Sequence, residues 1–140
     1  MNITKTDEVI SKKNANKRFS FRPEERIKQS RDFLVAKKLA RKFHTHDFIV
    51  LVMERKSKDR NLTLKSRLGI TVTTKAVPLS PHRNRLKRIL REAFRLHKHR
   101  LIKNFDIVVI VKETARRCTY FEVEQQLLNM LSQSGFLKLT

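Results

Sequence analysis

Residues 80–101 read SPHRNRLKRILREAFRLHKHRL, a long pattern in which apolar and basic residues alternate with helical spacing. Ser80 is a favourable N-cap and Pro81 a favourable first helical residue, so a helix is predicted to begin there. At about 100° per residue its apolar side chains fall in one broad arc, as in a helix that packs on a sheet. These side chains are Leu86, Ile89, Leu90, Ala93, Phe94, Leu96 and Leu101.

The opposite arc of this predicted helix is basic. Between positions 83 and 100 the only acid is Glu92, while Lys or Arg recur in every turn. Lys87 and Arg91, and again Arg91 and Arg95, are like charges at i,i+4, a spacing that destabilises an isolated helix. An ordinary solvated face mixes both signs of charge, so we interpret this face as a binding surface.

The start of the helix indicates what would bind. Arg83 and Arg85 lie in its first turns, where the helix dipole disfavours cations. The free backbone N–H groups of a helix N-terminus, together with forked guanidinium donors, instead make a strong phosphate site. The composition agrees, because 33 Lys and Arg against 13 Asp and Glu give a net charge of +20. Nucleic acid is the polyanion that fits best, and an anionic membrane surface is the rival.

The chain of 140 residues is long enough for one domain and hardly for two. It contains no apolar run of about 18 residues, so no membrane span is predicted. The N-terminus lacks the apolar core of a secretory signal. Cys118 is the only cysteine, which excludes an internal disulfide, favours a cytoplasmic setting and suggests a small core side chain.

Residues 1–20 are polar and aperiodic, and are predicted to form a flexible basic arm ahead of one domain, 21–140. A first helix is predicted from Ser30. Residues 48–53, FIVLVM, are typical of a buried strand, and the charged residues 55–66 suggest a hairpin loop. Residues 67–74 alternate as a strand with one core face does. The apolar positions assigned to the first helix are Phe33, Ala36, Ala40 and Phe43.

A further strand is predicted over 106–112 and a last helix from Thr119, where Thr119 and Glu122 form a capping-box pattern. Leu127, Leu128 and Leu131 would be its buried stripe, and Gly135 its stop. The order is helix, strand, strand, helix, strand, helix, with room for a third strand in the 55–75 region. This pattern predicts an α+β fold, in which the long helix could also connect two strands as a βαβ crossover.

RNA fits this arrangement better than DNA. A major-groove helix needs a scaffold such as a preceding helix, whereas here a strand comes first. A lightly covered sheet face suits a single RNA strand, which stacks on aromatics along a basic groove. Phe33 and Phe48 are the candidates for stacking, although a single Phe at helix or strand spacing is more often a core residue. The five histidines and one cysteine show no zinc-site spacing and the acids are scattered, so we expect no metal held by protein ligands alone and no catalytic cluster.

Residues 83–94, RNRLKRILREAF, are very similar to the RNR helix of the protein component of bacterial ribonuclease P. Residues 67–72, RLGITV, resemble the strand before that helix, and 106–110, DIVVI, the strand after it. Arg26-Ile27 followed by Asp32-Phe33 resembles the family's N-terminal helix. The resemblance spans about residues 19–138, with the pieces in the family's order.

This resemblance implies an αβββαβα fold with a mixed sheet and a left-handed βαβ crossover, where the general rule predicts a right-handed one. It also implies the function: the protein subunit of the ribonuclease P ribonucleoprotein binds the catalytic RNA and the 5′ leader of precursor tRNA. The RNA subunit, with Mg²⁺, performs the endonucleolytic cleavage that produces mature tRNA 5′ ends. We therefore expect a cytoplasmic protein that binds neither membrane nor DNA.

The resemblance also assigns roles to particular residues. Those expected to bind the catalytic RNA are Arg83, Asn84, Arg85, Lys87, Arg88, Arg91 and Arg95. Those expected in the leader-binding cleft are Phe33, Lys37, Phe48, Arg67 and Lys75. Residues 74–78 replace the family's Lys-Lys-Gly, and Lys37 and Leu51 replace aromatics, so leader binding is expected to depend more on charge. The alternative function is a structural RNA-binding protein, such as a ribosomal protein, without a role in tRNA processing.

Overall fold

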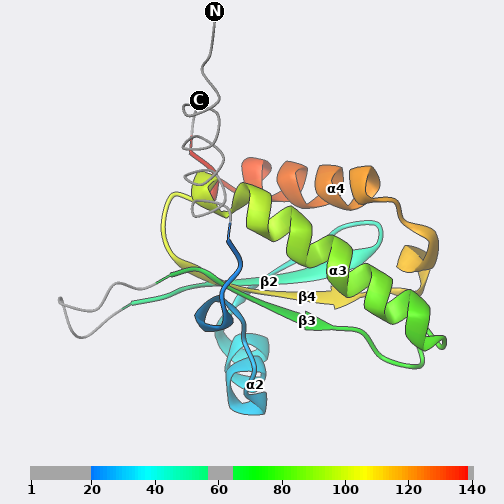
Figure 1. Ribbon diagram of the computed structural model, residues 1–140. Helices are drawn as coiled ribbons and strands as arrows, with labels where there is room; N and C mark the ends of the chain where they lie inside the picture. Colours follow the sequence, from blue (N-terminus) through cyan, green and yellow to red (C-terminus); the bar gives the residue numbers. More distant parts are fainter. Residues whose placement is uncertain (1–19, 57–64, 139–140) are drawn as a thin grey trace, which may run out of the picture.

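The computed structural model describes residues 20–56 and 65–138. Its centre is a four-stranded sheet with the strand order β1-β2-β4-β3 (Figure 1). β2 is antiparallel to both β1 and β4, whereas β3 is parallel to β4, so the sheet is mixed. The strands are β1 (Arg41–His44), β2 (Phe48–Glu54), β3 (Arg67–Thr71) and β4 (Phe105–Val111).

Helices cover both faces of this sheet (Figure 1). α2 (Ser30–Leu39) lies on one face, and α3 (Ser80–His97) and α4 (Tyr120–Gln133) lie on the other. Short 3-10 turns are η1 (Pro23–Glu25), η2 (Lys98–Arg100) and η3 (Glu113–Arg117). The order confirms the predicted αβββαβα fold. α3 joins two adjacent parallel strands, β3 and β4, and the handedness of this crossover stays a prediction. Residues 1–19 of the predicted arm and 57–64 of the predicted loop lie outside the described residues.

The residues predicted to begin and to end α4 are confirmed. Thr119 caps α4, because its Oγ1 accepts a hydrogen bond from the Glu122 backbone N–H at 3.2 Å. Gly135 has φ +80°, the left-handed conformation that ends a helix and that glycine adopts without strain. α3 begins at Ser80 itself, one residue earlier than predicted, with Leu79 as the N-cap and no side-chain cap.

The predicted first helix is too long. α2 ends at Leu39, Ala40 is extended, and Phe43 belongs to β1, where it pairs with Val50 of β2. The ring of Phe43 also meets the ring of Phe136 edge-on, with centroids 5.6 Å apart. Phe43 fits helical spacing, but strand pairing and this contact with the chain's other end outweigh that local pattern.

Two further predictions about the strands are wrong. The additional strand is β1 and not a segment within 55–75, where β3 is the only strand among the described residues. The connection 55–66 is also no hairpin loop, because β4 lies between β2 and β3. A strand arriving later in the chain pairs with both of them, and local sequence carries no signal of that insertion.

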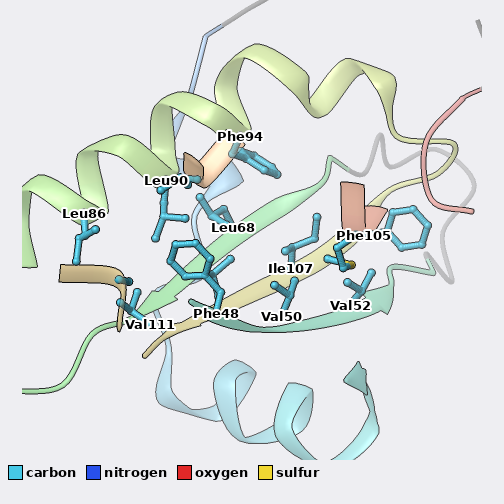
Figure 2. Packing of buried hydrophobic residues seen from close by; sticks show 14 of the residues in the cluster. Phe48, Val50, Val52, Leu68, Leu86, Leu90, Phe94, Phe105, Ile107 and Val111 are labelled. Carbon is cyan, nitrogen blue, oxygen red and sulfur yellow. The ribbon is translucent and has the colours of Figure 1, made fainter. Parts of the chain in front are cut away.

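The main core lies between the sheet and the α3–α4 layer (Figure 2). Alternate residues of β2 and β4 point into it, and Leu86, Leu90 and Phe94 of α3 meet them from above. A smaller cluster lies on the other face, where α2 packs. β4 is buried on both sides, which explains its continuous apolar run. The buried residues of the smaller cluster are Ile27, Ala36, Leu51 and Val108.

Gly69 sets the distance between α2 and the sheet. A Cβ at this position would lie 2.8 Å from Cε1 and 2.9 Å from Cζ of Phe33, and 3.1 Å from Cβ of Ile27. Those distances are below van der Waals contact, so any side chain at position 69 would displace the Phe33 ring. The glycine therefore seats Phe33 directly on β3.

We expect Gly69→Ala to destabilise the protein by about 1–3 kcal/mol, the usual cost of overpacking. Urea unfolding followed by circular dichroism measures this free energy. Phe33→Leu shortens the clashing side chain, so the double variant should lose less stability than the sum of the two single losses. Additive losses would show that the Phe33 ring is not what excludes a side chain at position 69.

Asp47 is a buried carboxylate that connects the β1–β2 turn to Cys118, just before α4, and to Gln126 within α4. It is 4% exposed and accepts hydrogen bonds from Cys118 Sγ at 3.0 Å and from Gln126 Nε2. Burial raises the pKa of Asp47, but hydrogen bonds from Cys118, Thr114, Gln126 and His46 outweigh it and bring that pKa to about 2. Burial, with the adjacent Asp47, raises the pKa of the Cys118 thiol to about 12, so Cys118 is a protonated core side chain as expected.

Asp47→Asn keeps the shape of the side chain but removes the anion that these donors face. We expect a loss of about 1–3 kcal/mol at pH 7. Because the pKa of Asp47 is lowered on folding, the stability it contributes is complete above pH 4 and disappears as the pH falls through about 2. Urea unfolding at pH steps from 7 to 2.5 should show the two proteins converging below pH 4. A difference that stays constant over this range would contradict the role of the charge.

Candidate nucleic-acid interface

The packing of α3 decides which of its side chains face outward. Leu86, Leu90 and Phe94 are buried against the sheet, as the sequence predicted (Figure 2), and Ala93 is buried as well. The basic residues fall on the opposite side of the helix, where Asn84, Arg85, Arg88 and Arg91 are exposed and Lys87 is half-buried. The amphipathic pattern therefore presents a row of cations to solvent.

A groove follows this row. One wall is α3, and the other is the segment of residues 20–28 that precedes α2. The groove has a volume of about 370 Å³. The residues that line it are Phe21, Arg26, Asn84, Lys87, Arg88, Arg91, Glu92 and Arg95.

The charges in the groove are strongly unbalanced. Its one acid, Glu92, accepts two hydrogen bonds from the Arg95 guanidinium, at 2.6 and 3.0 Å. Lys87, Arg88 and Arg91 have no ion-pair partner within residues 20–56 and 65–138. Burial, and repulsion from the cationic Arg26, lower the pKa of Arg91. Such a groove attracts a polyanion.

Arg83 and Arg85 also have structural contacts. Arg83 Nη1 donates to the carbonyls of Val77 at 3.0 Å and Pro78 at 2.7 Å, and so braces the turn before α3. Arg85 Nη2 donates to the carbonyl of Cys118 at 2.7 Å and joins α3 to the start of α4. Each guanidinium has five N–H donors, so both retain donors for phosphate. Their unusual place in the first turns is therefore partly explained by the fold.

The second predicted surface lies on the α2 side of the sheet. Phe33 is partly exposed where it rests on Gly69, and Lys37 is exposed on α2. Lys75 is exposed in the turn between β3 and α3. Arg67 is held by two hydrogen bonds to Asp106, at 2.8 and 2.7 Å, and lies 3.5 Å from Asp32. Lys37 and Lys75 have no ion-pair partner among the described residues, whereas Arg67 is held in place by two carboxylates.

The placement of Phe48 in a leader-binding cleft is wrong. Its side chain is 0% exposed and points toward α3, on the face of the sheet away from α2 (Figure 2). Adjacent residues of a strand point to opposite faces, so Ile49 and Leu51 are the β2 residues that meet α2. The apolar run 48–53 is buried on both faces, so its sequence carries no alternation that would reveal this orientation.

Two residues of the groove, Phe21 and Arg26, are not among the predicted RNA-binding residues. The only signal for Phe21 is an aromatic residue just after a polar arm. Arg26 belongs to the sequence that resembles the family's N-terminal helix, but it lies before α2 in extended backbone. Both reach α3 through tertiary packing, which has no counterpart in local sequence.

Within residues 20–56 and 65–138, no three His, Cys, Asp or Glu side chains come together as metal ligands. His97 Nε2 instead pairs with Glu124 at 2.9 Å, and Tyr120 donates to the same carboxylate at 2.7 Å. In the same part of the chain, no helix is both long and apolar enough to cross a membrane.

The fold and the basic groove define a small α+β protein that binds RNA. A family model described as Ribonuclease P matches residues 21–135. The ribonuclease P protein component of Thermotoga maritima is 37% identical over 118 residues, which are 81% of this chain and 95% of that protein. The component from Clostridium beijerinckii is 31% identical over 111 residues, which are 79% of this chain and 88% of that protein.

Solved structures agree with these relatives. The Staphylococcus aureus RNase P protein matches with a TM-score of 0.69 at 29% identity, over 81% of this chain and 98% of that one. The Thermotoga maritima RNase P protein matches with a TM-score of 0.64 at 36% identity, over 78% and 96%. This chain belongs to the ribonuclease P protein family. RNA binding in tRNA processing follows from that membership, and a purely structural RNA-binding protein is not favoured.

The Arg67–Asp106 pair yields a stability prediction. Arg67→Met would leave Asp106, which is 5% exposed, without its bidentate partner. We expect a loss of about 2–4 kcal/mol, below the usual cost for a fully buried pair because Arg67 is one-fifth exposed. Urea unfolding measures the loss.

Arg67→Met combined with Asp106→Asn removes both charges and is the matched control. It should be more stable than Arg67→Met alone, because no uncompensated charge remains buried. The same loss in both variants would mean that Arg55, whose Nε lies 3.5 Å from Oδ1 of Asp106, already balances this carboxylate.

Proposed function

We propose that the outward face of α3 binds the RNA subunit of ribonuclease P, and that the α2 side of the sheet binds the 5′ leader of precursor tRNA. This proposal is carried by the cations of the α3 groove that have no ion-pair partner among the described residues, in a member of this family. Lys87, Arg88 and Arg91 supply the charge, and Asn84, Arg83 and Arg85 add hydrogen-bond donors. The protein would work in the cytoplasm of a bacterium.

The leader would lie along α2 and the sheet. Phe33 offers a partly exposed ring, and Lys37 and Lys75 offer phosphate contacts. Arg67 would act mainly by positioning, since Asp106 and Asp32 already engage its guanidinium. With a single aromatic ring on this surface in place of several, leader binding here would depend chiefly on charge.

Mg²⁺ would supply the hydrolytic chemistry while bound mainly to the RNA. The protein's own contribution is electrostatic. Catalytic RNA and precursor tRNA repel each other, and a subunit with a net charge of +20 that contacts both reduces that repulsion.

Reconstitution tests the proposed function. Adding the protein to ribonuclease P RNA should increase precursor-tRNA cleavage at low Mg²⁺, where charge repulsion between the RNAs is screened least. A precursor with a one-nucleotide leader is the control, and should gain less because it cannot reach the α2 surface. Cleavage that does not change on addition of protein would favour the structural RNA-binding alternative.

Arg88→Ala should weaken binding to ribonuclease P RNA and reduce the log–log salt slope by about 0.7–1, because one phosphate contact disappears. The side chain is exposed, so the stability of the protein should be unchanged. Filter binding across a salt series measures the slope. Lys103→Ala is the control, since Lys103 pairs with Glu54 and lines no part of the groove. Equal slopes for both variants would remove Arg88 from the interface.

A further inference from the structure

The segment 20–28 is anchored at its first end against α3 and η2. Lys98 Nζ donates to the Glu25 carboxylate and to the carbonyl of Ser20. Glu25 is 2% exposed, so this ion pair is held inside the protein. The Phe21 ring meets the ring of Phe94 on α3 edge-on, with centroids 5.5 Å apart. The segment is therefore a fixed wall of the groove.

The other end of the segment is anchored on the edge strand of the sheet. Arg26 forms a parallel bridge with Leu68 of β3, and the Ile27 N–H donates to the Leu68 carbonyl at 3.0 Å. Adjacent residues in extended backbone point to opposite sides. Ile27 enters the small core under α2, and Arg26 lines the groove beside α3.

The groove continues past Arg26. A second hollow of about 230 Å³ adjoins the first and follows the edge of β3 toward Lys28. Phe21, Arg26, Lys87 and Arg91 line both hollows, so the two form one channel. Arg26 and Arg91 thus stand on its two walls, at the junction of the two parts.

Arg26 and Arg91 line both hollows, and the one acid in this lining, Glu92, pairs with Arg95. Arg26 stacks over the Phe21 ring, with Cζ 4.9 Å from the ring centroid, which holds the side chain against the wall. Neither Arg26 nor Arg91 has an ion-pair partner within residues 20–56 and 65–138. Two cations facing each other across a channel repel, and an anion between them turns that repulsion into attraction on both sides.

We propose that Arg26 and Arg91 form a two-walled clamp for one backbone phosphate of the bound RNA, with Phe21 holding Arg26 in position. The proposal rests on the proposed RNA-binding function, and it adds the segment before α2 to an interface otherwise built from α3. Forked guanidinium donors from both sides suit a phosphodiester, which offers two free oxygens. The channel's length along β3 suits a continuous strand.

Binding to ribonuclease P RNA across a salt series tests the clamp. Arg26→Gln and Arg91→Gln should each weaken binding roughly tenfold and each reduce the log–log slope by about 0.7–1. The double variant should bind only slightly more weakly than either single one, because both residues hold the same phosphate. Arg26→Lys should keep the slope but lose part of the affinity, since it retains the charge without the fork.

Lys103→Gln is the charge-matched control, and thermal unfolding checks that each variant is folded. If Arg26→Gln changes the RNA affinity and the salt slope no more than Lys103→Gln does, the clamp is wrong. So would a double variant whose loss equals the product of the two single losses, because the residues would then hold separate groups. If an acidic peptide competes with RNA for the wild type and not for Arg26→Gln, the channel holds carboxylates as well, and the assignment to phosphate is wrong.

A titration with inorganic pyrophosphate separates this inference from the proposed function. Nuclear magnetic resonance of the arginine Nε–H groups should show saturable shifts at both positions in the wild type, and in neither single variant. Saturable shifts in a protein that does not stimulate precursor-tRNA cleavage would support the clamp and reject the function. Stimulated cleavage with an Arg26→Gln variant that binds RNA like wild type would support the function and reject the clamp.

Discussion

The apolar side of α3 packs against the sheet, and this contact governs how the remaining elements are arranged. Leu86, Leu90 and Phe94 are buried there together with residues of β2, β3 and β4. Because this side of the helix is buried in the core, the basic side chains fall on its other side, where Arg88 and Arg91 are exposed. One packing interaction thus both closes the fold and places the basic face that we propose binds RNA.

Repulsion within this basic face lowers the stability of the isolated protein. Like charges at i,i+4 on α3 and the guanidinium of Arg26 opposite Arg91 repel one another, and Glu92 compensates only Arg95. The fold supports the arrangement with buried contacts, among them the pair of Lys98 with Glu25. Binding of a polyanion relieves the repulsion, so the charge pattern is suited to an RNA-bound protein.

The edge strand β3 lies between the two surfaces. On its α3 side, Arg26 bridges to Leu68 beside the channel, and on its α2 side, Phe33 rests on Gly69. The segment before α2 takes part in both arrangements, since its successive residues face opposite sides of the strand. On the proposed assignment, the protein would hold two RNA segments on the two sides of one edge strand.

Local sequence alone predicted the α+β class, the start of α3 within one residue, the cap and stop of α4, and the basic face, because periodicity and capping are local properties. Family resemblance added the strand count. Only the tertiary structure decided that Phe43 joins a strand, that β4 lies between β2 and β3, and that Phe48 faces α3. It also decided that Phe21 and Arg26 complete the channel. These outcomes depend on contacts between residues far apart in the chain, and a run that is apolar on both faces carries no local record of its orientation.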